Sequence, residues 1–240
     1  MGIPYAWADI SVQNDQKFLD REGYLHILGE VENHLNVPLN QIEILVTLYS
    51  KDNEAIGTMS ASSLLNTIMP GMKGPFELVI LGSQAKMVDS YFLDVEYTIS
   101  EPKGQVIDIT SSELERDKFD NLMIIGTIAN KGEITANSIS IVATLYDREG
   151  NVAAVSRAFA KPDYLGSNDE IFFLVSVPDR EQTKTIVDYS VIAESEEYTA
   201  VPEFPLGSLL LLAGSVSAYL ALNRYSSKVI PNLVCASNPT

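Results

Sequence analysis

Residues 42–49 read IEILVTLY, and residues 139–146, which lie 97 positions later (139 minus 42), read ISIVATLY. The same offset relates Gly29 to Gly126. A constant offset that holds through about twenty residues indicates a duplicated folding unit. A residue that the fold requires should then occur in both copies, whereas a residue that performs chemistry needs to occur only once. Each copy therefore serves as a control for the other.

Both copies carry the pattern of β-strands. Apolar residues occupy every second position of residues 25–31 and 42–48, which predicts strands with one buried face. Clusters of Pro, Gly, Asn and Asp separate such segments at intervals of about ten residues, and no long stretch has a helical period. We therefore predict an all-β fold with two tandem β-sandwiches, at residues 5–99 and 103–197.

Composition excludes several classes of protein. The chain has 240 residues, of which 46% are hydrophobic, so there is enough apolar material for one or two cores. The net charge is −16, and residues 203–240 contribute about +1 of it, which leaves −17 on the first 202 residues. This charge repels DNA and RNA, so we predict no nucleic-acid partner. The one cysteine, Cys235, cannot form a disulfide within the chain.

The second copy resembles a known family. Residues 143–147 read ATLYD, and Glu149, Gly150 and Asn151 follow. These residues resemble the signature strand and turn of the FxLYD domain, a small immunoglobulin-like sandwich of prokaryotic envelope proteins. The resemblance implies immunoglobulin-like sandwiches and a cell-envelope setting, and it provides no catalytic residues.

The first copy keeps other features of the same family. Residues 46–49 read VTLY, and Ser50 stands where the family has its aspartate. The Pro70-Gly71 pair followed by Phe76 resembles the family's turn and the phenylalanine of its next strand. In the second copy, Gly166 and either Phe172 or Phe173 stand in place of this turn and phenylalanine. The phenylalanine of the FxLYD signature itself is replaced in both copies, by Val46 and by Ala143.

An uncharged segment near the C-terminus predicts a membrane anchor. Residues 206–222 contain no charged residue and would span roughly 25 Å as a helix, near the lower limit for crossing a bilayer. A buried core helix is the alternative. Tyr219 and Tyr225 at one end, together with Arg224 and Lys228, are typical of a span whose C-terminal side is cytoplasmic. We therefore predict a transmembrane helix in contact with membrane lipid, sandwiches outside the cell, and a cytoplasmic tail at residues 223–240.

A short motif lies directly before that segment, at Pro202, Glu203, Phe204, Pro205 and Gly207. It resembles the PEF-type C-terminal sorting tail of archaeal surface proteins, which implies processing by an archaeosortase-like membrane transpeptidase. The alternative is that the prolines only stiffen a stalk at residues 198–205 and the anchor stays uncleaved. Sixteen residues follow Arg224 (240 minus 224), which is longer than such tails usually run.

The N-terminus lacks the features of an export signal. Residues 1–7 have neither a charged start nor an apolar stretch. We predict that a signal peptide is missing from the sequence. Insertion as a tail anchor, with the sandwiches in the cytoplasm, is the alternative, and the charge bias around residues 206–222 argues against it.

No catalytic, cofactor or metal site is predicted. The two histidines, His26 and His34, correspond to Met123 and Lys131 in the other copy. Zinc and copper sites need three or four converging ligands, so His26 is assigned to packing or to the surface. The chain also lacks the Gly-x-Ser-x-Gly nucleophile motif and phosphate-binding loops.

The acidic residues are predicted to lie in turns and in a stalk. Asp147, Glu149 and Asn151 alternate like a fragment of a calcium loop, although a hairpin turn explains them as well. The run of Glu194, Glu196 and Glu197 is predicted to be a solvated stalk.

Two polar pairs recur between the copies and predict structural roles. Asn33 and Asn130 are expected to bond to local backbone groups in a turn. Tyr49 and Tyr146 are expected to place their rings in the core and their hydroxyls on loop carbonyls.

Two functions are consistent with these features. The first is a non-catalytic archaeal surface protein, anchored in the membrane, whose sandwiches serve structural, adhesive or protein-binding roles with an unknown partner. The second is an extracytoplasmic accessory subunit of a transport or secretion complex. Gly207, Leu211 and Ser215 form a faint small-residue pattern that would favour packing against partner helices.

Overall fold

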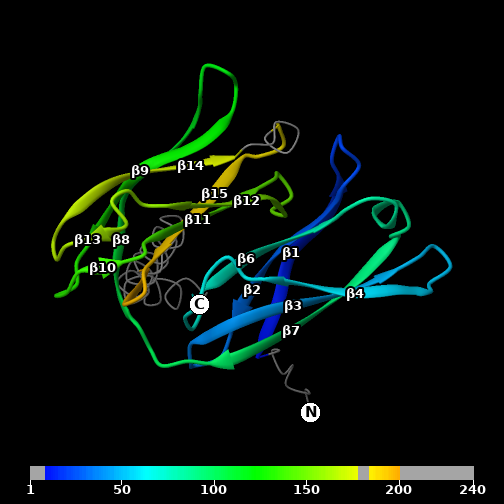
Figure 1. Ribbon diagram of the computed structural model, residues 1–240, viewed down its shortest axis with the longest axis horizontal. Helices are drawn as coiled ribbons and strands as arrows, with labels where there is room; N and C mark the ends of the chain where they lie inside the picture. Colours follow the sequence, from blue (N-terminus) through cyan, green and yellow to red (C-terminus); the bar gives the residue numbers. More distant parts are fainter. Residues whose placement is uncertain (1–8, 178–183, 201–240) are drawn as a thin grey trace, which may run out of the picture. The chain divides into compact units, whose positions relative to one another are not determined.

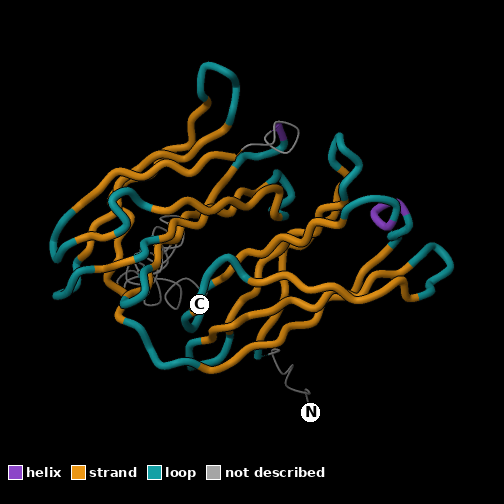
Figure 2. Tube along the Cα trace, viewed as in Figure 1, coloured by secondary structure: helices purple, strands orange, loops and turns teal. Residues whose placement is uncertain are grey.

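The computed structural model describes residues 9–177 and 184–200. These residues form sixteen β-strands and one short 3-10 helix, Gln84–Lys86, without an α-helix (Figures 1 and 2). The predicted all-β fold class is thus confirmed for this part of the chain. No helix within it has the length and apolarity needed to cross a bilayer. The helix predicted at residues 206–222 lies outside the described residues.

The first copy consists of two antiparallel sheets. One has the order β1-β2-β6, and in the other β3 pairs with β4, β5 and β7. The strands are β1 (Ile10–Leu19), β2 (Leu25–Asn33), β3 (Leu39–Tyr49), β4 (Ala55–Ser62), β5 (Thr67–Ile68), β6 (Lys73–Ile80) and β7 (Ser90–Ile99).

The second copy repeats this arrangement and extends one sheet. Its sheets have the orders β14-β9-β8-β16 and β12-β11-β15, and β10 pairs with β13. The added strand β16 runs parallel to β8, whereas the other pairs are antiparallel. The strands are β8 (Gly104–Arg116), β9 (Leu122–Asn130), β10 (Ala136–Asn137), β11 (Ser140–Tyr146), β12 (Val152–Phe159), β13 (Tyr164–Leu165), β14 (Glu170–Val177), β15 (Asp188–Glu194) and β16 (Tyr198–Ala200).

Each copy has its own hydrophobic core, formed by the alternating positions that predicted the strands. In the first copy Ile27, Ile44 and Leu48 are fully buried, and their cluster also contains Phe76 from β6. The second cluster draws on the matching strands β9, β11 and β14. Since apolar residues from both sheets meet in each cluster, two sheets enclose one core in each copy.

The copies agree in backbone detail as well as in strand order. Strands β2, β4, β5 and β6 begin and end 97 residues before β9, β12, β13 and β14. The turn before β6 has Gly71 at φ 76°, and the turn before β14 has Asn168 at φ 62°. Asn is the residue after Gly that best tolerates this left-handed conformation, so the second copy forms the turn without Pro-Gly.

The recurring asparagines have the structural role predicted for them. The Asn33 side chain donates to the carbonyls of Val37 and Ile68 at 2.9 Å each, and its Oδ1 accepts from the Leu35 N–H at 2.9 Å. Asn130 makes the same three bonds 97 residues later, to the carbonyls of Ile134 and Leu165 and from the N–H of Gly132. Both side chains are fully buried. Each side chain thus satisfies backbone groups that would otherwise be unpaired in the interior.

A matched pair of glycines makes room for a matched pair of phenylalanines. A Cβ added at Gly29 would lie 2.9 Å from the Phe76 ring, and one at Gly126 would lie 2.8 Å from the Phe173 ring. Phe173 is buried, whereas Phe172 is 58% exposed. Phe173 is therefore the counterpart of Phe76.

The predicted stalk differs from the structure. Glu194 is only 1% exposed, as the last residue of β15. Tyr198–Ala200 form β16 and pair with β8, so the second copy continues to at least residue 200. The acidic run did not reveal this because its charge alone suggested solvation, whereas the partners of Glu194 lie far away in the sequence.

Candidate functional site

The two copies belong to one compact unit and share a buried contact surface. On β2, Ile27 faces the first core, while Leu28 and Glu30 lie on the opposite face of the strand and are 0% and 2% exposed. β12 packs against β2 and β1, and Val142 of β11 joins the first core cluster. The outer face of the β1-β2-β6 sheet is therefore covered by the second copy.

A carboxylate lies at this contact surface. Glu30 Oε1 accepts a hydrogen bond from the Tyr146 hydroxyl at 2.6 Å, and its Oε2 accepts from Asn14 Nδ2 at 3.1 Å. Lys73 Nζ lies 3.8 Å from Glu30 Oε2. Burial and, next, the Glu30 charge raise the pKa of Tyr146. The hydroxyl of Tyr146 thus bonds to a carboxylate of the other copy, and the predicted bond to a loop carbonyl was wrong.

A second buried carboxylate joins the copies from the opposite direction. Glu194 accepts hydrogen bonds from the backbone N–H groups of Asn66 at 2.8 Å and Thr67 at 3.3 Å. Burial raises the pKa of Glu194, and the two N–H groups oppose this shift in part. Glu43 of β3 pairs with Glu96 of β7. Ser140 of β11, which is the equivalent of Glu43 in the second copy, pairs with Glu194. Glu96 is thus the counterpart of Glu194, but it is exposed.

His26 is held by carboxylates of its own copy. Its ring stacks on Phe18 at 4.9 Å, and its nitrogens lie 2.7 Å from Glu77 Oε1 and 3.1 Å from Asp20 Oδ2. The hydrogen bond with Glu77, above all, raises the pKa of His26, and burial opposes it. His26 therefore packs within the first copy, as predicted. Within the described residues no group of three or more His, Cys, Asp or Glu side chains is placed to hold a metal ion.

The acidic turn after β11 uses its oxygens locally. Asp147 Oδ1 accepts from the N–H groups of Glu149 at 3.0 Å and Asn151 at 2.8 Å, and Asp147 Oδ2 accepts from Asn151 Nδ2 at 3.3 Å. Gly150 is left-handed at φ 88°, and its N–H bonds to the Asp147 carbonyl. The hairpin turn that was weighed against a calcium loop is therefore the observed structure.

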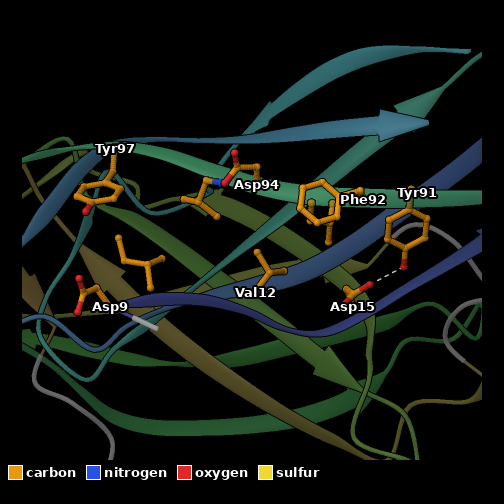
Figure 3. A pocket seen from close by; sticks show the side chains of 10 residues that line it. Asp9, Val12, Asp15, Tyr91, Phe92, Asp94 and Tyr97 are labelled. Carbon is orange, nitrogen blue, oxygen red and sulfur yellow. Dashed lines mark hydrogen bonds between the residues drawn. The ribbon is translucent and has the colours of Figure 1, made fainter. Parts of the chain in front are cut away.

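A groove lies on the open side of the first copy, between the edge strands β1 and β7 (Figure 3). Its volume is about 560 Å³, and its lining combines apolar, aromatic and acidic residues. The lining residues are Asp9, Ile10, Val12, Asp15, Tyr91, Phe92, Leu93, Asp94, Val95 and Tyr97. No Lys or Arg is among them, so the groove is acidic.

One end of the groove is closed by a hydrogen bond. The Tyr91 hydroxyl donates to Asp15 Oδ2 at 2.6 Å, which links β7 to β1 (Figure 3). Burial and, next, Asp15 raise the pKa of Tyr91. The same contact occurs in the second copy, where Ser112 Oγ and the Tyr189 hydroxyl are 3.2 Å apart. Because the contact recurs, we assign it to the fold.

The other end of the groove is particular to the first copy. Tyr49 of β3 pairs with Ser90 of β7, and the equivalent Tyr146 of β11 pairs with Asp188 of β15. Residues of β7 therefore match residues of β15 that lie 98 positions later (188 minus 90), whereas the offset elsewhere is 97. With the offset of 98, Asp94 corresponds to Ile192 and Tyr97 corresponds to Ser195. Asp9 lies before β1, where the offset is 97, and it corresponds to Val106. The acidic and aromatic groups of this end therefore occur only once, as expected of residues that serve a ligand.

The structure does not place the site residues predicted from the sequence. Pro202, Glu203, Phe204, Pro205, Gly207, Arg224 and Lys228 all lie outside the described residues. The groove was missed by the sequence analysis. Asp9, Asp94 and Tyr97 form no sequence motif, and they come together only because β1 and β7 lie beside each other in the folded first copy.

Part of the second copy is similar to a protein family. Residues 105–184 match a family profile described as "Protein of unknown function (DUF3426)". No curated protein matches the sequence. Among solved structures, the exo-chitosanase of Amycolatopsis orientalis aligns with 80% of this chain at 8% identity and a TM-score of 0.28, and the chain covers 26% of that enzyme. Red sea bream transglutaminase aligns with 81% of the chain at 8% identity and a TM-score of 0.24, with 32% of its own length covered.

Proposed function

We propose that the protein is a non-catalytic, membrane-anchored surface protein of archaeal type, which presents two immunoglobulin-like β-sandwiches for binding to another protein. The observation that carries the proposal is the contrast between its acidic groups. Glu30, Glu194 and His26 are engaged in contacts within the protein. Asp9 and Asp94, by contrast, line a groove of the first copy, and apolar residues, Val106 and Ile192, stand at their positions in the second copy.

The arrangement of strands supports the assignment to immunoglobulin-like domains of the FxLYD type. In the second copy the TLY motif lies on β11, at the centre of the β12-β11-β15 sheet, and the motif of the first copy lies at the matching place on β3. A central strand with both neighbours paired is the most buried position of a sandwich. This explains why an apolar strand motif would mark the fold.

Anchoring is supported by the sequence after residue 200. An uncharged segment at 206–222 followed by Arg224 and Lys228 fits a helix whose C-terminal side is cytoplasmic. The motif around Pro202 fits recognition by an archaeosortase-like enzyme. Together they would hold the acidic sandwiches on the outer side of the membrane, where their like charge would keep them from anionic lipid.

Two measurements on the native protein test this proposal. Labelling of intact cells with a membrane-impermeant amine reagent should modify exposed lysines such as Lys51, and lysed cells should give no additional labelling of the sandwiches. The intact mass should show loss of the residues after about Glu203 if the tail is processed, and a full-length mass would overturn the sorting step alone. Lysines that react only after lysis would place the sandwiches inside the cell and overturn the surface assignment.

Purification in mild detergent separates the surface protein from the accessory subunit. A free-standing surface protein should be recovered without an equimolar integral-membrane partner. Recovery of such a partner in constant ratio through several columns would favour the accessory subunit of a transport or secretion complex.

A further inference from the structure

The packing of the second copy on the first buries one outer sheet face of each copy. β12 contacts β2, β1 and β6, and Val142 of the neighbouring strand β11 joins the first core cluster. Leu28 on β2 is 0% exposed in this contact, and Val142 is 2% exposed. Both copies are built from two sheets, so each copy also has a second outer face, which this contact does not use.

The unused face of the second copy is the counterpart of the face that is covered on the first copy. It belongs to the β14-β9-β8 sheet, where Ile125 of β9 corresponds to the buried Leu28 at the offset of 97. Ile125 pairs with Leu174 of β14, and Phe172 lies two residues before Leu174 on the same face. Leu174 is 46% exposed and Phe172 is 58% exposed, and neither belongs to the second core cluster. Within the described residues this apolar face is therefore open.

The unused face of the first copy is the counterpart of the face with which the second copy makes the contact. On β3, Leu45 and Thr47 correspond to Val142 and Thr144 of β11 at the offset of 97. Val142 and Thr144 are 2% and 3% exposed, whereas Leu45 and Thr47 are half-buried. The positions that the contact buries in the second copy are thus only partly covered in the first.

The strands that would repeat this contact between two molecules carry no charged residue. Within the molecule β12 lies against β2, and the counterparts of these strands are β4 and β9. β4 reads AIGTMSAS, and β9 reads LMIIGTIAN. The acidic residues of the two faces lie on neighbouring strands and include Glu43, Asp94, Glu96, Glu113 and Glu115. Two neutral strands therefore meet at the centre of such a contact, although the chain has a net charge of −16.

We propose that the molecules associate head to tail, with the outer β14-β9-β8 face of one molecule packed on the outer β4-β3-β7 face of the next. The partner on each open face is thus a second copy of this chain, and the contact repeats the one between its own two sandwiches. Because the contact joins two unlike faces, every added molecule leaves one face of each kind open, and the assembly grows beyond a dimer. This inference goes beyond the proposed function and does not depend on the membrane anchor.

Single-cysteine variants test which faces meet. Within the molecule Gln16 Nε2 donates to the Val152 carbonyl at 2.8 Å, and the counterparts of these residues are Glu113 and Ala55. Both counterparts are exposed, so Glu113→Cys and Ala55→Cys are each introduced into the full-length protein with Cys235→Ser. A short bis-maleimide reagent should link the two variants when they are mixed in detergent, and it should link neither variant to itself. Equal linking of each variant to itself would overturn head-to-tail packing.

Association itself is measured by sedimentation of the full-length protein in detergent over a range of concentrations. Species larger than a dimer should accumulate, and more so at about 0.5 M salt, where the screening length is about 4 Å and like net charges repel less. Leu174→Asp should raise the dissociation constant by about tenfold or more, because it places a carboxylate in the apolar contact. Leu81→Asp is the matched control, since Leu81 is 61% exposed directly after β6 and lies on neither face. Its effect should stay within about twofold.

Three results of the sedimentation measurement would overturn the proposal. These are a monomer at every concentration and salt, a dimer that grows no further, and equal effects of Leu174→Asp and Leu81→Asp. The assignment to the cell surface would stand in each case, because labelling of intact cells tests it separately.

Discussion

The hydroxyl of Tyr146 donates a hydrogen bond of 2.6 Å to Glu30 Oε1, across the contact between the two copies of the repeat. Glu30 is 2% exposed, and it corresponds to Thr127 in the second copy, so this pair has no duplicate. In the opposite direction, the Glu194 carboxylate of the second copy accepts hydrogen bonds from the N–H groups of Asn66 and Thr67 in the first copy. Each copy thus contributes one buried carboxylate that bonds to groups of the other copy. The buried carboxylates thus help to determine how the copies are joined.

Tyr146→Phe should lower the free energy of unfolding by about 1–2 kcal/mol, because it leaves the buried carboxylate of Glu30 without one donor. Tyr49→Phe is the matched control at the equivalent position of the first copy, and it should change stability by less than about 0.5 kcal/mol. Urea unfolding followed by circular dichroism measures both. Equal losses would show that the contact with Glu30 does not distinguish the two tyrosines.

Glu194 should make stability depend on pH in a direction opposite to that of most carboxylates. Since burial raises its pKa in the folded state, the folded protein holds this proton more tightly than the unfolded chain. Its contribution is fully present below the unfolded pKa of about 4.3 and is lost as pH rises through the folded pKa. Relative to wild type, Glu194→Gln should remove this dependence when unfolding is measured from pH 4.5 to 7.

Glu96→Gln provides the control for that comparison. Glu96 is the exposed counterpart of Glu194 on β7, so its variant makes the same chemical change without the burial. If the two variants altered the pH dependence alike, the effect would come from the net charge of the protein rather than from the buried site.

His26 should stabilise the fold most strongly in its protonated form. Its pKa is raised, chiefly by the hydrogen bond with Glu77, so its contribution is fully present below the unfolded pKa of about 6.5 and is lost as pH rises through the folded pKa. His26→Phe keeps a ring for stacking on Phe18 but removes the charge. The loss of stability in this variant should therefore be larger at pH 6 than at pH 9.

The titration of the His26 ring can be followed directly by NMR. Glu77→Gln should bring the pKa of His26 back toward 6.5, because it removes the first of the two partners that raise it. A pKa that did not move in this variant would assign the shift to another group.

Asn33→Ala and Asn130→Ala should destabilise the protein by similar amounts, about 3 kcal/mol each, because each removes three buried hydrogen bonds. Asn66→Ala is the control, since the exposed side chain is lost and the backbone N–H that bonds to Glu194 remains. Its effect should stay within about 0.5 kcal/mol. A loss confined to one of the two buried asparagines would mean that the copies do not share this turn's role.

Much of the fold was predictable from the sequence because its causes are local. Alternating apolar residues at 25–31 and 42–48 predicted β2 and β3, and recurrence predicted that Asn33 and Asn130 serve backbone groups. The burial of Glu194 was not predictable, because Glu96 has the same side chain at the same place in its copy and is exposed. Only contact between the copies makes the two glutamates different.

The candidate site shows the same division. Asp94 and Tyr97 carry no motif, and their replacement by Ile192 and Ser195 in the second copy does not by itself distinguish them from other unduplicated residues. Their proximity to Asp9 arises when β1 and β7 close the first copy from opposite ends of its sequence.

The sequence by itself determined the repeat, the all-β class and the paired turns, since strand alternation and side-chain capping act within a few residues of one another. Tertiary structure alone decided which glutamates are buried, where β16 pairs, and which sheet edge remains open. Those outcomes depend on faces and edges that meet only after distant residues come together, such as Asn66 and Glu194, which are 128 positions apart.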